Sequence, residues 1–145
     1  MTDEAAPTNW TGYLLNTLGA GVREATAEAL TPWGITPRDL GALMALADSP
    51  GLSQIALGRQ IGMDRTSILQ LADRLEAAGW VERHAHPADR RVNLLVLSRA
   101  GHQRLCEAVP AARAAEARCL ASLTRSERDT LQSLLRRALG EDSAG

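Results

Sequence analysis

The sequence contains no phenylalanine, only one tyrosine and only two cysteines, Cys106 and Cys119. Two cysteines are too few for a disulfide-stabilised scaffold, and their spacing matches no zinc-binding motif. No apolar run approaches the roughly 20 residues that a membrane-spanning helix requires. Residues 1–9 carry two acidic side chains and no apolar core, so they do not resemble a secretory signal. We therefore expect a cytoplasmic protein without a membrane partner.

The motifs that mark common enzyme sites are also missing from the sequence. There is no glycine-rich phosphate loop, no Gly-x-Ser-x-Gly elbow and no His-Glu-x-x-His pair. His84 and His86 could bind a metal ion, but alternate residues on an exposed hairpin more often lie near phosphates. We predict that the protein is not an enzyme and has no catalytic residues, no cofactor and no metal site.

The 145 residues are 45% hydrophobic, which indicates one globular domain of ordinary size. The formal net charge is only −1, but the basic residues are unevenly placed. Residues 1–50 carry two arginines and six acidic residues, whereas residues 59–91 carry six arginines and five acidic residues. Every basic residue is arginine, which suits bidentate contacts with phosphate and guanine. Because the chain is also rich in alanine, a compositional bias of the gene is the simpler explanation for the use of arginine in place of lysine.

Apolar residues at helical spacing and helix-capping residues predict six helices. The first extends from Trp10 to Leu30, and the second begins at Thr36-Pro37 and breaks at 48–51. Ser53 caps a third helix, with Ile55, Ala56 and Leu57 on its inner side, that ends near Gly62. Asp64 caps a fourth that runs to Ala78 and stops at Gly79. A long helix follows Ser98, where Pro110 should kink or interrupt it, and a capping box at 124–127 opens the last.

Two strand-like segments, 81–83 and 92–97, follow the fourth helix and are joined by the turn-prone segment 84–89. Helix, turn, helix and hairpin in this order specify a winged helix-turn-helix. The predicted fold class is therefore mainly α: six helices with a two- to three-stranded wing sheet.

The fourth helix has two different sides at 100° per residue. Its apolar side consists of Ile68, Leu71, Ala72, Leu75 and Ala78 and should pack on the third helix. Its opposite side and flanks carry Thr66, Gln70 and Asp73 with Arg65, Ser67, Leu69 and Arg74. Glutamine can bond adenine and arginine can bond guanine, while hydroxyls in a first helical turn suit a phosphate. An ordinary solvated surface helix would show the same pattern.

The predicted hairpin carries Asp89, Arg90 and Arg91 at its tip. Arginines on such a tip can enter a minor groove, where the negative potential attracts guanidinium groups. Asp89 can pair with Arg91 and fix its direction, and Arg90 should favour a phosphate. A solvated charged turn is the simpler alternative, but the position directly after a helix-turn-helix favours DNA.

Four segments carry a resemblance to a known family: Asp64-Arg65-Thr66-Ser67, Leu71 to Arg83, Pro87-Ala88-Asp89-Arg90-Arg91 and Leu95 to Gly101. In combination they resemble the MarR family of bacterial transcription regulators. The resemblance implies a homodimer whose first and last two helices interlock. It also implies a DNA-binding set of Ser53, Arg65, Thr66, Ser67, Gln70, Arg74, Asp89, Arg90 and Arg91. Trp80 departs from the commoner leucine or isoleucine and should pack under the wing.

The division that we expect is a helical dimerisation region, 1–35 and 99–145, and a DNA-binding domain, 36–98. The first helix and residues 108–139 carry more apolar surface than a DNA-binding domain of about 60 residues can cover. Two copies related by a two-fold axis would read half-sites 34–36 Å apart on a near-palindrome.

The resemblance further implies a small-molecule pocket, often for aromatic or phenolic anions. Trp10, Tyr13, Trp33 and Met44 are candidates to line it, although each could simply be a core residue. Cys106 and Cys119 are best explained as unreactive thiols, with redox sensing or an inter-subunit bridge as alternatives.

Our hypothesis is a homodimeric repressor, associated with the bacterial nucleoid, that a small aromatic ligand releases from a palindromic operator. Its partners would be double-stranded DNA, a second copy of the chain and the effector. The alternative is a winged-helix protein-interaction module without specific DNA binding.

Overall fold

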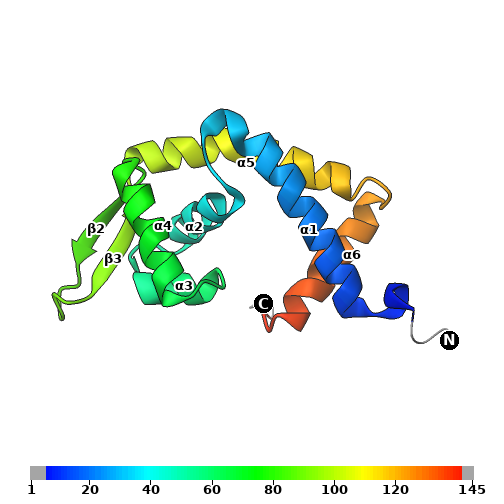
Figure 1. Cartoon of the computed structure of the whole chain (residues 1–145), viewed down its shortest axis with the longest axis horizontal. Coiled ribbons are helices and arrows are strands. Elements are labelled where there is room, and N and C mark those ends of the chain that lie inside the picture. The colour runs from blue at the N-terminus through cyan, green and yellow to red at the C-terminus, as the bar shows by residue number, and fades with distance from the viewer. Residues whose placement is uncertain (1–5, 142–145) are drawn as a thin grey trace. The chain divides into compact units, whose positions relative to one another are not determined.

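The computed structural model describes residues 6–141, and its internal contacts divide the chain into two units (Figure 1). The central unit is Thr26–Arg113, and the terminal unit combines Met1–Ala25 with Ala114–Gly145. No helix of the described residues is long and apolar enough to cross a membrane. We describe each unit by itself.

The described chain contains six α-helices and a three-stranded antiparallel sheet, which confirms the predicted fold class. The central unit holds η3 (Thr31–Trp33), α2 (Pro37–Asp48), β1 (Leu52–Ser53), α3 (Gln54–Gln60), α4 (Arg65–Ala77), β2 (Val81–Ala85) and β3 (Asn93–Leu97). The terminal unit holds η2 (Pro7–Asn9) and α6 (Arg125–Ala138). Two long helices contribute to both units: α1 (Thr11–Leu30) and α5 (Arg99–Cys119).

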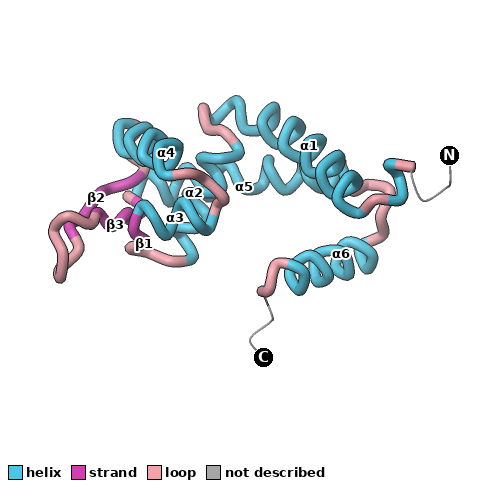
Figure 2. Tube along the Cα trace, turned by 60° about the horizontal axis from the view of Figure 1, so that its bottom comes forward, coloured by secondary structure: helices cyan, strands magenta, loops and turns pink. Residues whose placement is uncertain are grey.

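The sheet has the strand order β1-β3-β2, and Figure 2 shows its three strands beside α2, α3 and α4. The hairpin expected from the sequence forms in the register Val81 opposite Leu97 and Ala85 opposite Asn93. The short β1 pairs Leu52 with Leu95 just before α3 begins. The wing is thereby anchored at the side of β3 that faces the helix-turn-helix.

The predicted capping residues begin their helices as expected. The side chains of Thr36, Ser53 and Asp64 each accept a hydrogen bond from the backbone N–H three residues later, at 3.2, 3.1 and 2.8 Å. Thr124 and Glu127 form the predicted capping box of α6. Such caps stabilise a helix by about 0.5–2 kcal/mol because they satisfy otherwise unpaired N–H groups.

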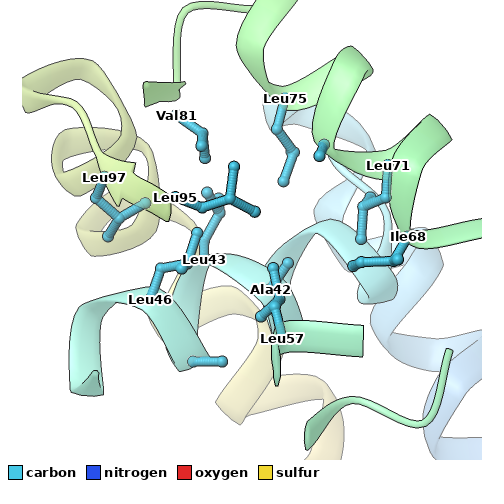
Figure 3. Close-up of a cluster of buried hydrophobic side chains, with 12 residues drawn as sticks. Ala42, Leu43, Leu46, Leu57, Ile68, Leu71, Leu75, Val81, Leu95 and Leu97 are labelled. Carbon is cyan, nitrogen blue, oxygen red and sulfur yellow. The ribbon is translucent and has the colours of Figure 1, made fainter. Parts of the chain in front are cut away.

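The core of the central unit lies between the sheet and helices α2, α3 and α4 (Figure 3). Figure 3 labels its larger members: Leu43, Leu46, Leu57, Ile68, Leu71, Leu75, Val81, Leu95 and Leu97. The inner side predicted for α4 is confirmed at Ile68, Leu71, Ala72 and Leu75. Burying one leucine or isoleucine contributes about 1.5–3 kcal/mol, so these side chains determine which side of α4 remains outside.

Two details of the sequence prediction are wrong, and one half of a third is excluded. Ala78 is exposed because it is the C-cap of α4 and lies beyond the packed turns. Ile55 is 57% exposed because α3 is short and buries only the side that carries Leu57 and Gly58. Of the two outcomes expected at Pro110, an interruption does not occur, because α5 continues from Arg99 to Cys119, and a kink stays a prediction. The alanines on either side of it, Ala108 and Ala112, are buried in a hydrophobic cluster of the central unit.

The start of α5 is fastened to the end of α4 through Ser98 and Trp80. The Ser98 hydroxyl donates to the Gly79 carbonyl at 2.6 Å and accepts from the Gly101 N–H at 3.0 Å. The Ser98 N–H donates to the Trp80 carbonyl at 3.0 Å. The Trp80 ring packs against both hydrophobic clusters of the central unit, one of which includes the wing strands. The Arg104 guanidinium lies 5.5 Å from the centre of that ring.

Gly101→Ala should lower the melting temperature, because a Cβ at Gly101 would lie 2.0 Å from the Trp80 carbonyl oxygen. Overpacking of this kind reduces the free energy of unfolding by about 1–3 kcal/mol. Gly41→Ala is the control, since a Cβ at Gly41 would meet no neighbouring side chain within 4 Å and alanine favours a helix. Thermal unfolding followed by circular dichroism measures both variants. Equal melting temperatures would contradict the tight junction.

Candidate nucleic-acid interface

The N-terminus of α4 presents the polar side that the sequence predicts. Arg65, Thr66, Gln70 and Asp73 are exposed there, opposite the buried side. Ser67 has a different environment, because its N–H and its hydroxyl both donate to the Asp64 carboxylate at 2.8 Å. The hydrogen bond from the Ser67 N–H is the main cause of the lowered pKa of Asp64. Ser67 is therefore engaged in the cap, and Thr66 keeps the exposed hydroxyl of this turn.

Ser53 is also a capping residue, half-buried at the junction of β1 and α3. Its Oγ accepts from the Ala56 N–H at 3.1 Å. The hydroxyl retains its own proton for donation to an outside acceptor, since it acts as the acceptor in the cap. A DNA contact by Ser53 stays a prediction.

Arg74 forms an ion pair with Asp39 of α2, and sequence reasoning did not anticipate this contact. Asp39 is buried, and its Oδ2 accepts from the Thr36 N–H at 2.7 Å and the Thr36 hydroxyl at 2.9 Å. Its other oxygen accepts from Arg74. The sequence pattern at Thr36-Pro37 predicts only the start of α2, and nothing local links Asp39 to a residue 35 positions later. Arg74 thus fixes α4 against α2, while 55% of its side chain remains exposed.

Arg83 of β2 forms a second set of ion pairs that the sequence analysis did not predict. Its guanidinium donates to both Asp73 and Glu76 on α4. Burial lowers the pKa of Arg83, but the hydrogen bonds with Asp73 and Glu76 outweigh that effect and raise it. Only 19% of its side chain is exposed. One guanidinium therefore ties the first wing strand to the exposed side of α4.

The wing tip holds Arg91 in the pairing expected with Asp89. The Asp89 carboxylate accepts from the Arg91 N–H and Nε at 3.0 Å and from its Nη2 at 3.2 Å. These bonds lower the pKa of Asp89, the side-chain bond contributing most. The Arg91 side chain is nevertheless 91% exposed, and Arg90 beside it is exposed as well. The pair thus orients a guanidinium without covering it.

A hollow of about 210 Å³ lies between the start of α3, the outer side of α4 and the wing. Arg65 of α4 and Arg91 of the wing both line it, together with Gln54, Ile55 and Leu69. A second hollow of about 140 Å³ is lined by Arg38, Met63, Ser67, Gln70, Leu71 and Arg74. The helix and the wing therefore contribute cationic side chains to one continuous face of the central unit.

The four candidate ligand residues divide between the two units. Trp10 and Tyr13 lie in the terminal unit and are 64% and 50% exposed. Trp33 and Met44 lie in the central unit, where Trp33 packs against a hydrophobic cluster and Met44 is 47% exposed. The two hollows above are lined by other residues. A ligand role for these four side chains stays a prediction.

The histidines and cysteines considered for metal binding or redox chemistry make local contacts or remain free thiols. Residues 6–141 contain no group of three or more His, Cys, Asp or Glu side chains that could hold a metal ion. On the wing, His84 lies 3.2 Å from Glu82, and His86 accepts from the Ala88 N–H at 3.0 Å. Cys106 and Cys119 are both free thiols.

Comparison with known proteins gives one consistent result. Residues 33–92 match the model of the MarR family. A putative transcriptional regulatory protein for the hcr operon of Thauera aromatica is 36% identical over 124 residues, which cover 86% of this chain and 75% of that protein. The transcriptional repressor Rv2887 of Mycobacterium tuberculosis is 34% identical over 131 residues, which cover 90% of this chain and 94% of that protein.

Solved structures of Rv2887 show the same architecture. Its complex with p-aminosalicylic acid has a TM-score of 0.76 at 32% identity and covers 89% of this chain and 98% of that one. Its complex with DNA has a TM-score of 0.74 at 31% identity, with coverage of 89% and 97%. The similarity therefore extends over both units of the chain.

Arg74→Met should destabilise the protein more than Asp39→Asn does. The first change leaves a buried carboxylate without its cation, whereas the second leaves an arginine that water already reaches. Removing one partner of a fully buried pair costs about 3–5 kcal/mol, and we expect about 1–3 kcal/mol here because Arg74 is half-exposed.

Thermal and urea unfolding of both single variants and the double variant measure this difference. The free energy of unfolding of the double variant should be close to that of Asp39→Asn, because the unpaired carboxylate charge is then absent. If Arg74→Met unfolds like the original protein, the ion pair does not hold α4 in place.

Proposed function

Because the chain belongs to the MarR family of transcriptional regulators, whose members are not enzymes, we propose that it binds double-stranded DNA as a homodimer. In this proposal α4 enters the major groove and the wing enters the adjacent minor groove. Arg65, Thr66 and Gln70 face the base edges, and Arg90 and Arg91 approach the backbone and the minor groove. Ser53, Ser67, Arg74 and Asp89 position these contacts from the same face.

One observation carries the proposal: Arg65 of α4 and Arg91 of the wing line the same hollow. A base-reading helix and a minor-groove arginine must reach one duplex together, and a shared hollow brings them to one face. The Asp89 pair supports this role, because it orients Arg91 and leaves the side chain 91% exposed. The DNA complex of the relative Rv2887 adds support from a protein of the same architecture.

The terminal unit provides the surface that we assign to dimerisation, as part of the wider helical region 1–35 and 99–145. Large apolar side chains are exposed along α1, along α6 and at the C-cap of α6: Tyr13, Leu14, Leu15, Leu18, Leu134, Leu135 and Leu139. Extended apolar surface of this kind marks an interface. A two-fold axis through it would present two copies of the domain 36–98 to half-sites 34–36 Å apart.

We further propose that a small aromatic acid releases the protein from its operator on the bacterial chromosome. The complex of Rv2887 with p-aminosalicylic acid supports this class of effector. Trp10, Tyr13, Trp33 and Met44 are the side chains proposed to contact it. Ligand and DNA would favour different separations of the two α4 helices, so each would weaken binding of the other by the same factor.

The protein should bind one fragment from around its own gene in preference to others, with an affinity that falls steeply as salt increases. Arg91→Ala should weaken this binding about tenfold or more, because it removes a charge-assisted contact and leaves Asp89 uncompensated. The melting temperature should not change, since the side chain is exposed. Gel-shift titration measures the affinity.

Arg59→Ala is the matched control, because it removes an exposed arginine of α3 that lines neither hollow and lies outside the region assigned to dimerisation. It should leave the affinity within about twofold. Weak, equal binding to all fragments would instead support a protein-interaction module. An Arg91→Ala affinity within twofold of the original would show that the wing does not contact DNA.

Thermal-shift screening against phenolic and other aromatic acids should identify a stabilising compound. At 100 times its dissociation constant, a compound that binds only the native protein contributes about 2.7 kcal/mol. The same compound should weaken operator binding in the gel-shift titration. A compound that stabilises the protein but leaves operator affinity unchanged would contradict the proposed release.

A further inference from the structure

Leu69 is an exception on the outer side of α4. That side is otherwise polar, yet Leu69 is 43% exposed in the middle of it. Ile55 at the start of α3 is 57% exposed, and both side chains line the hollow of about 210 Å³. Leaving a large apolar side chain in water forgoes about 1.5–3 kcal/mol of burial. Two such side chains in one hollow indicate that an apolar group from outside covers them.

The hollow also contains a hydrogen-bond donor that is not used within the described chain. The Nε2 atom of Gln54 is buried and has no hydrogen-bond partner among the described residues. Gln54 lines the same hollow as Leu69 and Ile55. A buried donor without a partner costs about 1–3 kcal/mol. The expected occupant therefore combines an apolar group with an acceptor.

The rim of the hollow carries positive charge. Arg65 and Arg91 both line it, and Arg91 is held outward by Asp89. Charge of this sign complements phosphates and disfavours a purely apolar partner such as a lipid tail. The DNA base that shows a methyl group beside an acceptor in the major groove is thymine, through C5-methyl and O4.

We propose that Leu69 and Ile55 form a receptor for the 5-methyl group of one thymine in each half-site, with Gln54 available to its O4. The inference rests on the proposed function and deepens it, because it assigns a specificity determinant to an apolar side chain. Arg65 contacts a neighbouring base edge, Arg91 approaches the backbone and the minor groove, and Leu69 selects the base that carries the methyl group. The preferred site should then contain a thymine whose methyl group, and not only its hydrogen bonds, is recognised.

Replacing thymine by deoxyuridine removes only the methyl group and tests this directly. Starting from the preferred fragment, each thymine of one half-site is replaced in turn, and the affinity of the full chain is measured. At one position we expect about fourfold weaker binding, equivalent to the ~0.8 kcal/mol of one buried methylene-sized group. Leu69→Ala should bind both versions of that site alike, while Leu69→Ile should retain the discrimination.

Ala77→Ser is a matched control on the exposed surface of α4, outside the hollow, and should discriminate as the original protein does. If the original protein prefers one fragment but no deoxyuridine changes its affinity, the methyl receptor is wrong and the proposed function stands. If Leu69→Ala weakens both versions equally, Leu69 does not select the methyl group. If no fragment is preferred at all, the proposed function itself fails.

Discussion

The position of α4 is the constraint on which the DNA-facing surface depends. Its apolar side is buried in the central core, which leaves one orientation of the helix about its own axis. The pair of Arg74 with Asp39 then fixes α4 against α2, and Arg83 fixes the wing strand β2 against α4. The α4 residues proposed to touch DNA take their direction from these contacts, and Arg91 of the wing takes its direction from Asp89.

Arginine serves two separate purposes in the central unit. Arg74 and Arg83 pair with carboxylates and hold elements together, so their charge is largely compensated within the chain. Arg65 and Arg90 have no ion pair among the described residues, and Arg91 keeps its guanidinium outward despite its pair. The near-zero net charge therefore does not argue against a DNA partner, because Arg65 of α4 and Arg91 of the wing present their cationic side chains to the same hollow.

The local features of the fold could be predicted from the sequence, and the long-range contacts could not. Capping residues such as Thr36 act on N–H groups three residues away, so a short pattern is sufficient to identify them. Ile55 was misplaced because helical spacing does not show how few turns of a short helix are packed. The helical wheel places Arg74 on a flank of α4 and the family resemblance implies a DNA contact, but neither indicates its ion pair with Asp39, which lies 35 residues earlier. A local pattern in a single sequence does not identify a contact partner that is distant along the chain.

The double attachment of Arg83 has a mechanical consequence. Tilting the wing against the recognition helix would separate one poorly hydrated guanidinium from two carboxylates at once. The recognition helix α4 and the wing hairpin should therefore move together as a rigid body. An effector that alters operator affinity would then move the recognition helix and wing of one protomer as a unit relative to those of the partner. The regulated quantity would be the distance between the two units, and not the conformation within each.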